Sequence, residues 1–234
     1  MQLIPIENLF YMLLPLAVVG YIYYLWLDDA KEILYATFRM VTQLLLIGYI
    51  LVYLFDTNSW MVGVVVLSVM VIMSSFIVVR NIENKSLTSY MIILFSIAFG
   101  GSIILFLVIK FVLELTSFYE PKYTIPLAGM IYANSMNAIS LVAERFEKEI
   151  KNSSLNQAKQ TSFKASMIPI INSFLAVGVV SLPGMMSGQI LSGVDPLIAV
   201  RYQIVVMAMV LGSAGISVIV YLSFMKVLSG KNSI

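Results

Sequence analysis

The polar residues that could bind a ligand lie inside long apolar stretches of this sequence. Asn134 and Asn137 are three positions apart, so a helix places both amides on one face, with Ser135 beside them. Asn172 and Ser173 form a second polar pair in another apolar stretch. Polar groups in a membrane are functional candidates, because an unpartnered polar group is costly in lipid. We interpret these residues as candidates for lining a translocation path; the alternative is ordinary hydrogen bonding between helices, worth about 0.6 kcal/mol each.

A glycine-rich apolar segment, residues 183–196, holds three further candidates for the path. They are Met185, Met186 and Gln189. Thioethers can ligate soft metal ions such as Cu(I), but methionine also fills irregular gaps in packing. The sequence therefore leaves open whether these methionines bind a metal ion. Gly184 and Gly188 form a pair of small residues that allows close contact between helices. The segment is predicted to be a re-entrant or broken-helix element near the outer mouth, the alternative being an ordinary outer loop.

The composition indicates a membrane protein. Of 234 residues, 60% are hydrophobic and 11% charged, whereas soluble domains are about 45–50% apolar and about 25% charged. The sequence has no Cys and no His, which excludes a disulfide framework, a His-based catalytic triad and a typical zinc site. A net charge of +2 is too small for a nucleic-acid surface.

Seven stretches are long and apolar enough, or nearly so, to cross a bilayer as helices. They are Leu9–Leu27, Met40–Phe55, Trp60–Val79, Tyr90–Ile109, Tyr123–Ala143, Ala165–Pro183 and Tyr202–Met225. We therefore predict an all-α integral membrane protein, a bundle of about seven transmembrane helices in a single domain, 1–234. The first stretch is expected to be a retained helix rather than a signal peptide, because Met1–Asn8 has no basic residue.

The distribution of basic residues predicts how the chain is oriented. The loops after the first, third, fifth and seventh stretches carry eleven Lys and Arg, and the other loops carry three. Cytoplasmic loops are enriched in Lys and Arg. The N-terminus is therefore expected outside the membrane and the C-terminus in the cytoplasm.

The connection 144–164 holds eight of the 26 charged residues and is predicted to form a cytoplasmic helical elbow. Glu144 with Lys148 and Glu147 with Lys151 have the i,i+4 spacing of helical ion pairs. Residues 154–157 have the form of a capping box, which begins a second helix. Such an elbow could dock a cytoplasmic partner; the alternative is a solvated linker. The candidate coupling residues are Glu144, Arg145, Glu147, Lys148, Lys151, Asn156, Gln157 and Lys159.

Two stretches together resemble the Fet-type ABC transporter permeases. One is Ile125–Ala138, with Ile-Pro-Leu-Ala-Gly-Met-Ile and Asn-Ser-Met-Asn-Ala, and the other is Val180–Met207, with Pro-Gly-Met-Met. The family includes bacterial proteins assigned to iron export and plant aluminium-tolerance half transporters. The resemblance implies a permease subunit in a bacterial inner (plasma) membrane, paired with a second copy and with a separate ATPase that binds ATP and Mg. It implies no cofactor, nucleic acid or catalytic residue in this chain, which also has no Gly-x-x-x-x-Gly-Lys-Ser/Thr phosphate loop.

One departure from the family concerns the elbow. Its members carry a longer segment here, with a Leu-Gly-Ala stretch, and only Asn156-Gln157-Ala158 resembles the end of that segment. Either the elbow is shortened, or part of a loop is missing from this sequence.

The resemblance leaves two kinds of cargo open. One is iron or another metal, and the other is a nucleotide sugar or similar organic anion, which the lack of His and Cys mildly favours. A seven-helix receptor or retinal protein is a third reading. A retinal protein needs a Schiff-base Lys in the middle of a span, whereas Lys226 lies at the very end of the seventh.

Overall fold

The computed structural model describes residues 4–27, 30–56, 59–117 and 119–231, and these ranges are helical over most of their length. The predicted all-α class is confirmed. The chain forms two compact units, Met1–Thr57 and Asn58–Ile234, which are described separately here.

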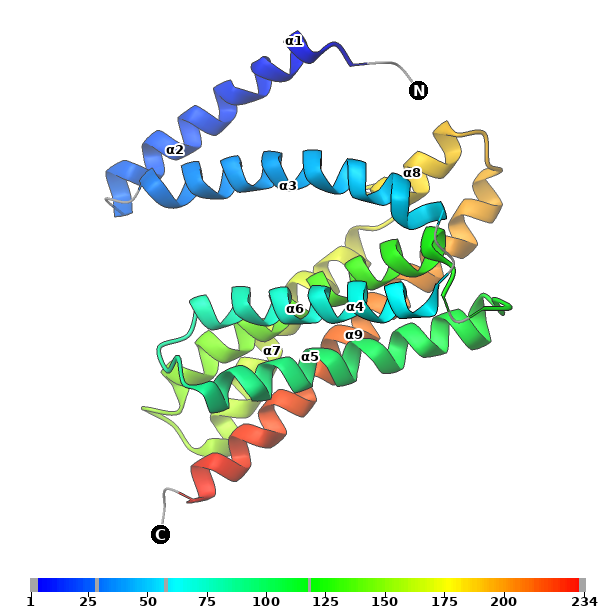
Figure 1. The fold of residues 1–234 in the computed structure, drawn as a ribbon. Helices are drawn as coiled ribbons and strands as arrows, with labels where there is room; N and C mark the ends of the chain where they lie inside the picture. The colour runs from blue at the N-terminus through cyan, green and yellow to red at the C-terminus, as the bar shows by residue number, and fades with distance from the viewer. Residues whose placement is uncertain (1–3, 28–29, 57–58, 118, 232–234) are drawn as a thin grey trace. The chain divides into compact units, whose positions relative to one another are not determined.

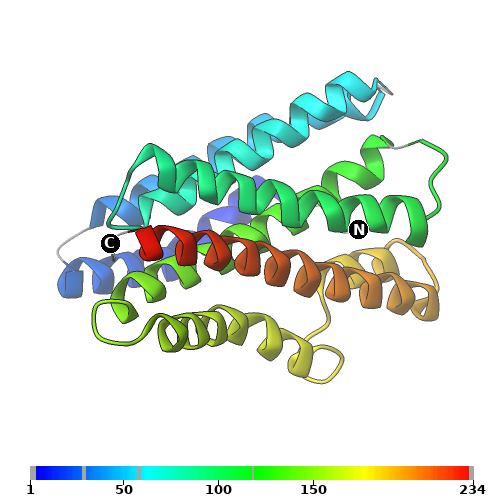
Figure 2. The same ribbon diagram turned by 90° about the horizontal axis from the view of Figure 1, so that it is seen from below.

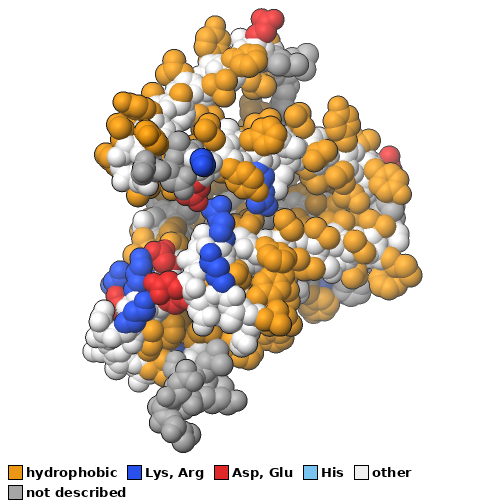
Figure 3. Space-filling model, turned by 60° about the vertical axis from the view of Figure 1, so that its left-hand side comes forward, with side chains coloured by type: hydrophobic (Ala, Val, Ile, Leu, Met, Phe, Trp, Pro, Cys, Tyr) orange, Lys and Arg blue, Asp and Glu red, His pale blue; other side chains and the backbone are white. Residues whose placement is uncertain are grey.

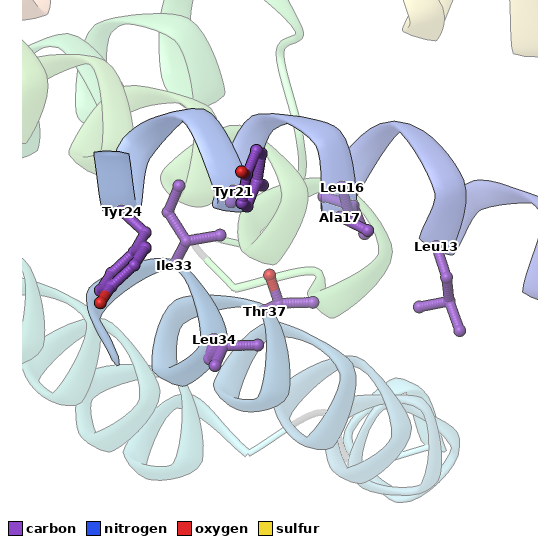
Figure 4. Close-up of a pocket in the computed structure, with 9 residues that line it drawn as sticks. Leu13, Leu16, Ala17, Tyr21, Tyr24, Ile33, Leu34 and Thr37 are labelled. Carbon is purple, nitrogen blue, oxygen red and sulfur yellow. The ribbon is translucent and has the colours of Figure 1, made fainter. Parts of the chain in front are cut away.

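The first unit is a pair of apolar helices. It contains α1 (Ile6–Leu9), a 3₁₀ turn (Phe10–Met12), α2 (Leu13–Leu27) and α3 (Ala30–Asp56). Within this unit, α2 and α3 contact each other near the connection between them and diverge away from it (Figure 1). The hydroxyl of Tyr23 on α2 donates a hydrogen bond to Glu32 Oε2 on α3, at 2.6 Å. Figure 4 shows the apolar pocket of about 400 Å³ between the two helices, which includes Leu16, Tyr21 and Ile33.

The second unit is a helical bundle. Its elements are α4 (Trp60–Arg80), α5 (Leu87–Leu107) with a π-helical turn (Val108–Val112), α6 (Pro121–Glu149), α7 (Leu155–Ala176), α8 (Gly184–Leu191) and α9 (Pro196–Lys231). The long helix α9 packs against α5, α6 and α7, and these elements run side by side in both ribbon views (Figures 1 and 2). Fully buried Ile93, Ile131, Ile139 and Val218 lie in the shared core.

Among the described residues, six helical segments have the length and composition to cross a membrane. They are Glu7–Leu27, Lys31–Asp56, Trp60–Arg80, Leu87–Val112, Pro121–Glu149 and Pro196–Met225. Each matches a predicted span. The sixth predicted span corresponds to α7, which is less apolar and ends at Ala176 rather than Pro183. The helix ends early because Val177 is extended (ψ 132°) and Gly178, at φ +81°, completes a type II turn in which the N–H of Val179 donates to the carbonyl of Ala176 at 3.2 Å.

A short helix follows this turn in the glycine-rich segment. Pro183 precedes α8, and Gly193 (φ +91°) ends it. The N–H of Val194 donates to the carbonyl of Gln189 and that of Gly193 to Ile190, both at 3.0 Å, which is the Schellman arrangement. Asp195 then begins α9 by accepting a hydrogen bond from the N–H of Leu197, at 2.8 Å. The helix is therefore broken here as predicted, while its depth in the membrane stays a prediction.

Two glycines on α5 lie against neighbouring helices with no room for a Cβ atom. A Cβ atom on Gly100 would lie 2.7 Å from the backbone nitrogen of Ser217 on α9, and one on Gly101 would lie 2.5 Å from the ring of Tyr132 on α6. The predicted pair, Gly184 and Gly188, makes no such approach, because a Cβ on either would meet no described atom within 4 Å. Within the single chain, tight packing therefore falls at Gly100 and Gly101, while close contact at Gly184 and Gly188 stays a prediction.

Candidate functional site

A polar pocket lies between α6, α7 and α9. Its volume is about 230 Å³, and its lining consists of Asn134, Asn137, Ala138, Leu141, Ser166, Pro169, Ile170, Ser173, Met207 and Val210. The amides of α6 share one face because residues three and four apart on a helix are neighbours. Two predicted groups, from the fifth and sixth spans, are thus brought together.

The polar groups of this pocket can still accept hydrogen bonds. The Asn134 amide donates to the carbonyl of Met130 at 2.8 Å, and the Ser173 hydroxyl donates to the carbonyl of Pro169 at 3.0 Å. Each of these bonds uses a donor, so the oxygen of each side chain keeps its lone pairs. Asn137 is exposed in the single chain. The arrangement can therefore bind a ligand through amide and hydroxyl groups.

The other predicted path residues lie elsewhere. Asn172 is exposed on α7 but does not line the pocket. Ser135 is fully buried on α6, and its hydroxyl has no hydrogen-bond partner among the described residues. Met185, Met186 and Gln189 are half-buried on α8, outside the pocket lining.

Sequence reasoning missed Ser166 and Met207 as lining residues of this pocket. A signal for Ser166 was available. Ala158, Ser162, Ser166 and Ile170 recur every four positions and form the buried face of α7. Three of these four residues are small, and α7 packs against α6.

The predicted elbow is present between α6 and α7. The capping box is confirmed: Ser154 Oγ accepts a hydrogen bond from the N–H of Gln157 at 3.4 Å, and Gln157 Oε1 accepts one from the N–H of Ser154 at 3.2 Å. Glu144 and Lys148 form the predicted ion pair at 2.6 Å. Asn156 is exposed and Lys159 half-buried on the first turns of α7.

The second predicted ion pair of the elbow, Glu147 with Lys151, is wrong. Helix α6 ends at Glu149, two residues before Lys151, and the two side chains each bind another partner. Lys151 Nζ instead lies 2.7 Å from Glu83 Oε2, in the loop between α4 and α5. Glu147 accepts hydrogen bonds from the N–H groups of Glu83 and Asn84 in that loop, at 2.9 and 3.4 Å. Sequence spacing could not reveal these contacts, because the partners are more than sixty positions apart.

The surface of the elbow and of the loop beside it carries both acidic and basic side chains. Arg145 and Glu149 form another i,i+4 pair at 2.7 Å. The hydrogen bond from Lys151 and its positive charge hold the pKa of Glu83 below its usual value, and Glu83 in turn raises the pKa of Lys151. Both groups are therefore ionised at neutral pH. Figure 3 shows acidic and basic side chains gathered close together, while hydrophobic side chains cover much of the remaining face.

The capping box gives a direct test of the elbow. Replacing Ser154 with alanine is expected to destabilise the first turn of α7 by about 1 kcal/mol, because the N–H of Gln157 loses its acceptor. Hydrogen exchange of the amides at the start of α7 should accelerate about fivefold. Asn156→Ala, at an exposed neighbouring position, is the control and should leave this exchange rate unchanged; equal rates in both variants would contradict the capping role.

The chain matches one known protein family over most of its length. The model of the "Uncharacterised protein family (UPF0014)" matches residues 6–228. The chain belongs to the UPF0014 family. The matched range includes the three helices of the polar pocket and the elbow, so both features lie within the part of the chain that UPF0014 describes.

Curated UPF0014 relatives are similar over most of the chain. The "Probable iron export permease protein FetB" of Escherichia coli is 32% identical, over 87% of this chain and 84% of its own length. The "UPF0014 membrane protein slr1647" of Synechocystis is 31% identical, over 79% and 78%. "Protein ALUMINUM SENSITIVE 3" of Arabidopsis thaliana is 30% identical, over 80% and 72%. The predicted family resemblance is confirmed, and the chain is a multi-pass membrane protein. No solved structure matches it.

Proposed function

We propose that this chain is the permease subunit of an ATP-driven exporter whose ATP and Mg are bound by a separate ATPase subunit, and that its cargo is a metal, iron in the first instance. The polar pocket between α6, α7 and α9 carries the proposal, since it gathers amides and hydroxyls inside a bundle of membrane-crossing length. The similarity to the E. coli protein named as an iron export permease supports the direction and the cargo.

The exposed polar residues beside this pocket support a working unit of two permeases. Asn137 and Ser173 line the pocket and are exposed in the single chain, although they lie on helices of the membrane bundle. Amides that face lipid are costly, so this face needs a protein or water-filled surrounding. A second copy of the chain on this face would enclose the path between two permeases.

The elbow is the proposed contact with the ATPase. It carries ion pairs and exposed polar side chains, which suit a soluble partner. The loops that include the elbow and the C-terminus hold most of the basic residues, as cytoplasmic loops do. In this proposal the chain crosses a bacterial inner membrane with the elbow and the C-terminus in the cytoplasm and the N-terminus outside.

A second cargo is favoured by the chemistry of the pocket lining. Its polar groups are two asparagine amides and two serine hydroxyls, Asn134, Asn137, Ser166 and Ser173. Neutral donors and acceptors of this kind pair well with the hydroxyls of a sugar. A nucleotide sugar or similar organic anion is therefore the alternative cargo.

Reconstitution separates the two cargoes. The permease is purified with its ATPase, placed in liposomes, and assayed for ATP hydrolysis with Fe²⁺ or with UDP-sugars. We expect Fe²⁺ to stimulate hydrolysis and to accumulate on the far side of the membrane. Stimulation by UDP-sugars alone would replace iron with the second cargo. An ATPase that neither co-purifies nor responds to either cargo would contradict the exporter itself.

A further inference from the structure

We infer that the loop between α4 and α5, residues 81–86, belongs to the same ATPase-docking platform as the elbow, and that Glu147 is the positioning residue that joins them. This inference rests on the proposed exporter function. It adds a second loop to the contact with the ATPase, and no family resemblance or spacing pattern pointed to that loop. The platform is defined here as residues 81–86 together with residues 144–157.

The carboxylate of Glu147 holds the loop by its backbone. Glu147 Oε2 accepts a hydrogen bond from the N–H of Glu83 at 2.9 Å, and its Oε1 accepts one from the N–H of Asn84 at 3.4 Å. A charged acceptor on two successive backbone donors makes stronger bonds than a neutral one. Because both donors are backbone groups, the contact fixes the path of the loop and not merely the rotamer of one side chain.

A second contact ties the loop to the turn of the elbow. Lys151 Nζ donates to Glu83 Oε2 at 2.7 Å. Ile82 is 4% exposed and anchors the start of the loop in the core. At the other end, Ser86 Oγ accepts a hydrogen bond from the N–H of Ser89 and begins α5. The loop is thus held at both ends and in its middle.

The outward surface of the platform suits a soluble protein partner. Glu83, Asn84 and Lys85 are exposed on the loop, as Lys151 and Asn156 are on the elbow. Leu87 lies beside them with 77% of its surface exposed, which supplies an apolar contact within a charged rim. Protein interfaces combine these features, whereas a lipid-facing surface is apolar throughout. An ATPase docked on this surface would contact both loops together.

The connection has a mechanical consequence. Residues 81–86 join α4 to α5, and the elbow joins α6 to α7. With Glu147 between them, movement of the ATPase is passed to both helix pairs as one body. Without it, the elbow moves α6 and α7 while the other pair stays behind, so ATP hydrolysis continues with less dependence on cargo.

The test compares Glu147→Ala with Glu120→Ala in the complete permease–ATPase complex in liposomes. Glu120 precedes α6 at its other end, outside the platform, and its Oε1 accepts a long hydrogen bond from Thr116 Oγ1 at 3.5 Å, so its removal leaves the loop contact intact. We expect Glu147→Ala to lower the ratio of Fe²⁺-stimulated or UDP-sugar-stimulated to basal ATP hydrolysis about tenfold, because the loop is then released from the elbow. Glu120→Ala should keep the ratio within about twofold of wild type, because this change touches neither loop of the platform.

Two further measurements keep the inference testable if Glu147→Ala folds poorly. Glu147→Gln keeps one acceptor oxygen and should give an intermediate ratio. Because the sequence has no Cys, spin labels attached at Asn84→Cys and Asn152→Cys report the distance between the two loops directly. The distribution of this distance should broaden in Glu147→Ala. A wild-type ratio in Glu147→Ala, or a change of equal size in Glu120→Ala, would overturn the shared platform while leaving the exporter intact. A wild-type chain that binds no ATPase would overturn both.

Discussion

Transport is expected to fall by about tenfold or more when Asn134 and Asn137 are both replaced with leucine. Leucine has the same branching at Cγ and the same number of side-chain heavy atoms as asparagine, and it favours helix, so α6 should keep its fold. The variant removes both amides from the pocket lining. The polar groups of a bound cargo then lose their hydrogen-bond partners, which costs about 1–3 kcal/mol of binding free energy for each group. Cargo-stimulated ATP hydrolysis and cargo accumulation in liposomes both measure the loss.

Asn172→Leu is the matched control for this prediction. It removes the same amide from an exposed position on α7 that does not line the pocket. Stimulated hydrolysis should stay within about twofold of wild type, since the change affects no pocket group. If Asn172→Leu stops transport while the double variant on α6 does not, the path runs along the outer face of α7 instead of through this pocket.

The lining residues of the pocket could be predicted from the sequence on α6 but only in part on α7. On α6 the spacing of Asn134 and Asn137 was enough, because a helix of known register fixes which residues share a face. On α7 the neighbouring residues Asn172 and Ser173 point about 100° apart, and only Ser173 lines the pocket. The rotation of α7 is set by its packing against other helices, so composition alone could not choose between them.

The elbow shows the same division between local and distant interactions. The capping box at Ser154 and the Glu144–Lys148 pair depend on residues three or four positions apart, and both were predictable. The partner of Glu147 depends on where the loop at residue 83 lies after α4 and α5 have packed. Helix spans were predictable for a related reason: bilayer thickness sets their length, except where the turn at Val177 and Gly178 ends α7 early.

Close packing of α5 on α9 gives the second large effect. Gly100→Ala is expected to destabilise the bundle by about 1–3 kcal/mol, because the added Cβ would lie 2.7 Å from the backbone nitrogen and 2.9 Å from the Cα of Ser217. Backbone atoms cannot move aside as a flexible side chain can, so one helix must shift. Alanine favours helix over glycine by about 1 kcal/mol, and the clash has to outweigh this gain. Thermal unfolding in detergent measures the net effect.

Gly215→Ala separates the clash from helix propensity, because the two substitutions are chemically identical and differ in surroundings. Gly215 lies on α9 two residues before Ser217, and a Cβ there would meet no described atom within 4 Å. Its midpoint of unfolding should therefore rise slightly, while that of Gly100→Ala falls. A higher midpoint of unfolding in both variants would mean that the gap between α5 and α9 at Gly100 and Ser217 is wide enough for a Cβ atom. A fall in both, with Gly215→Ala also losing its second copy on a sizing column, would place Gly215 at the contact between two permeases.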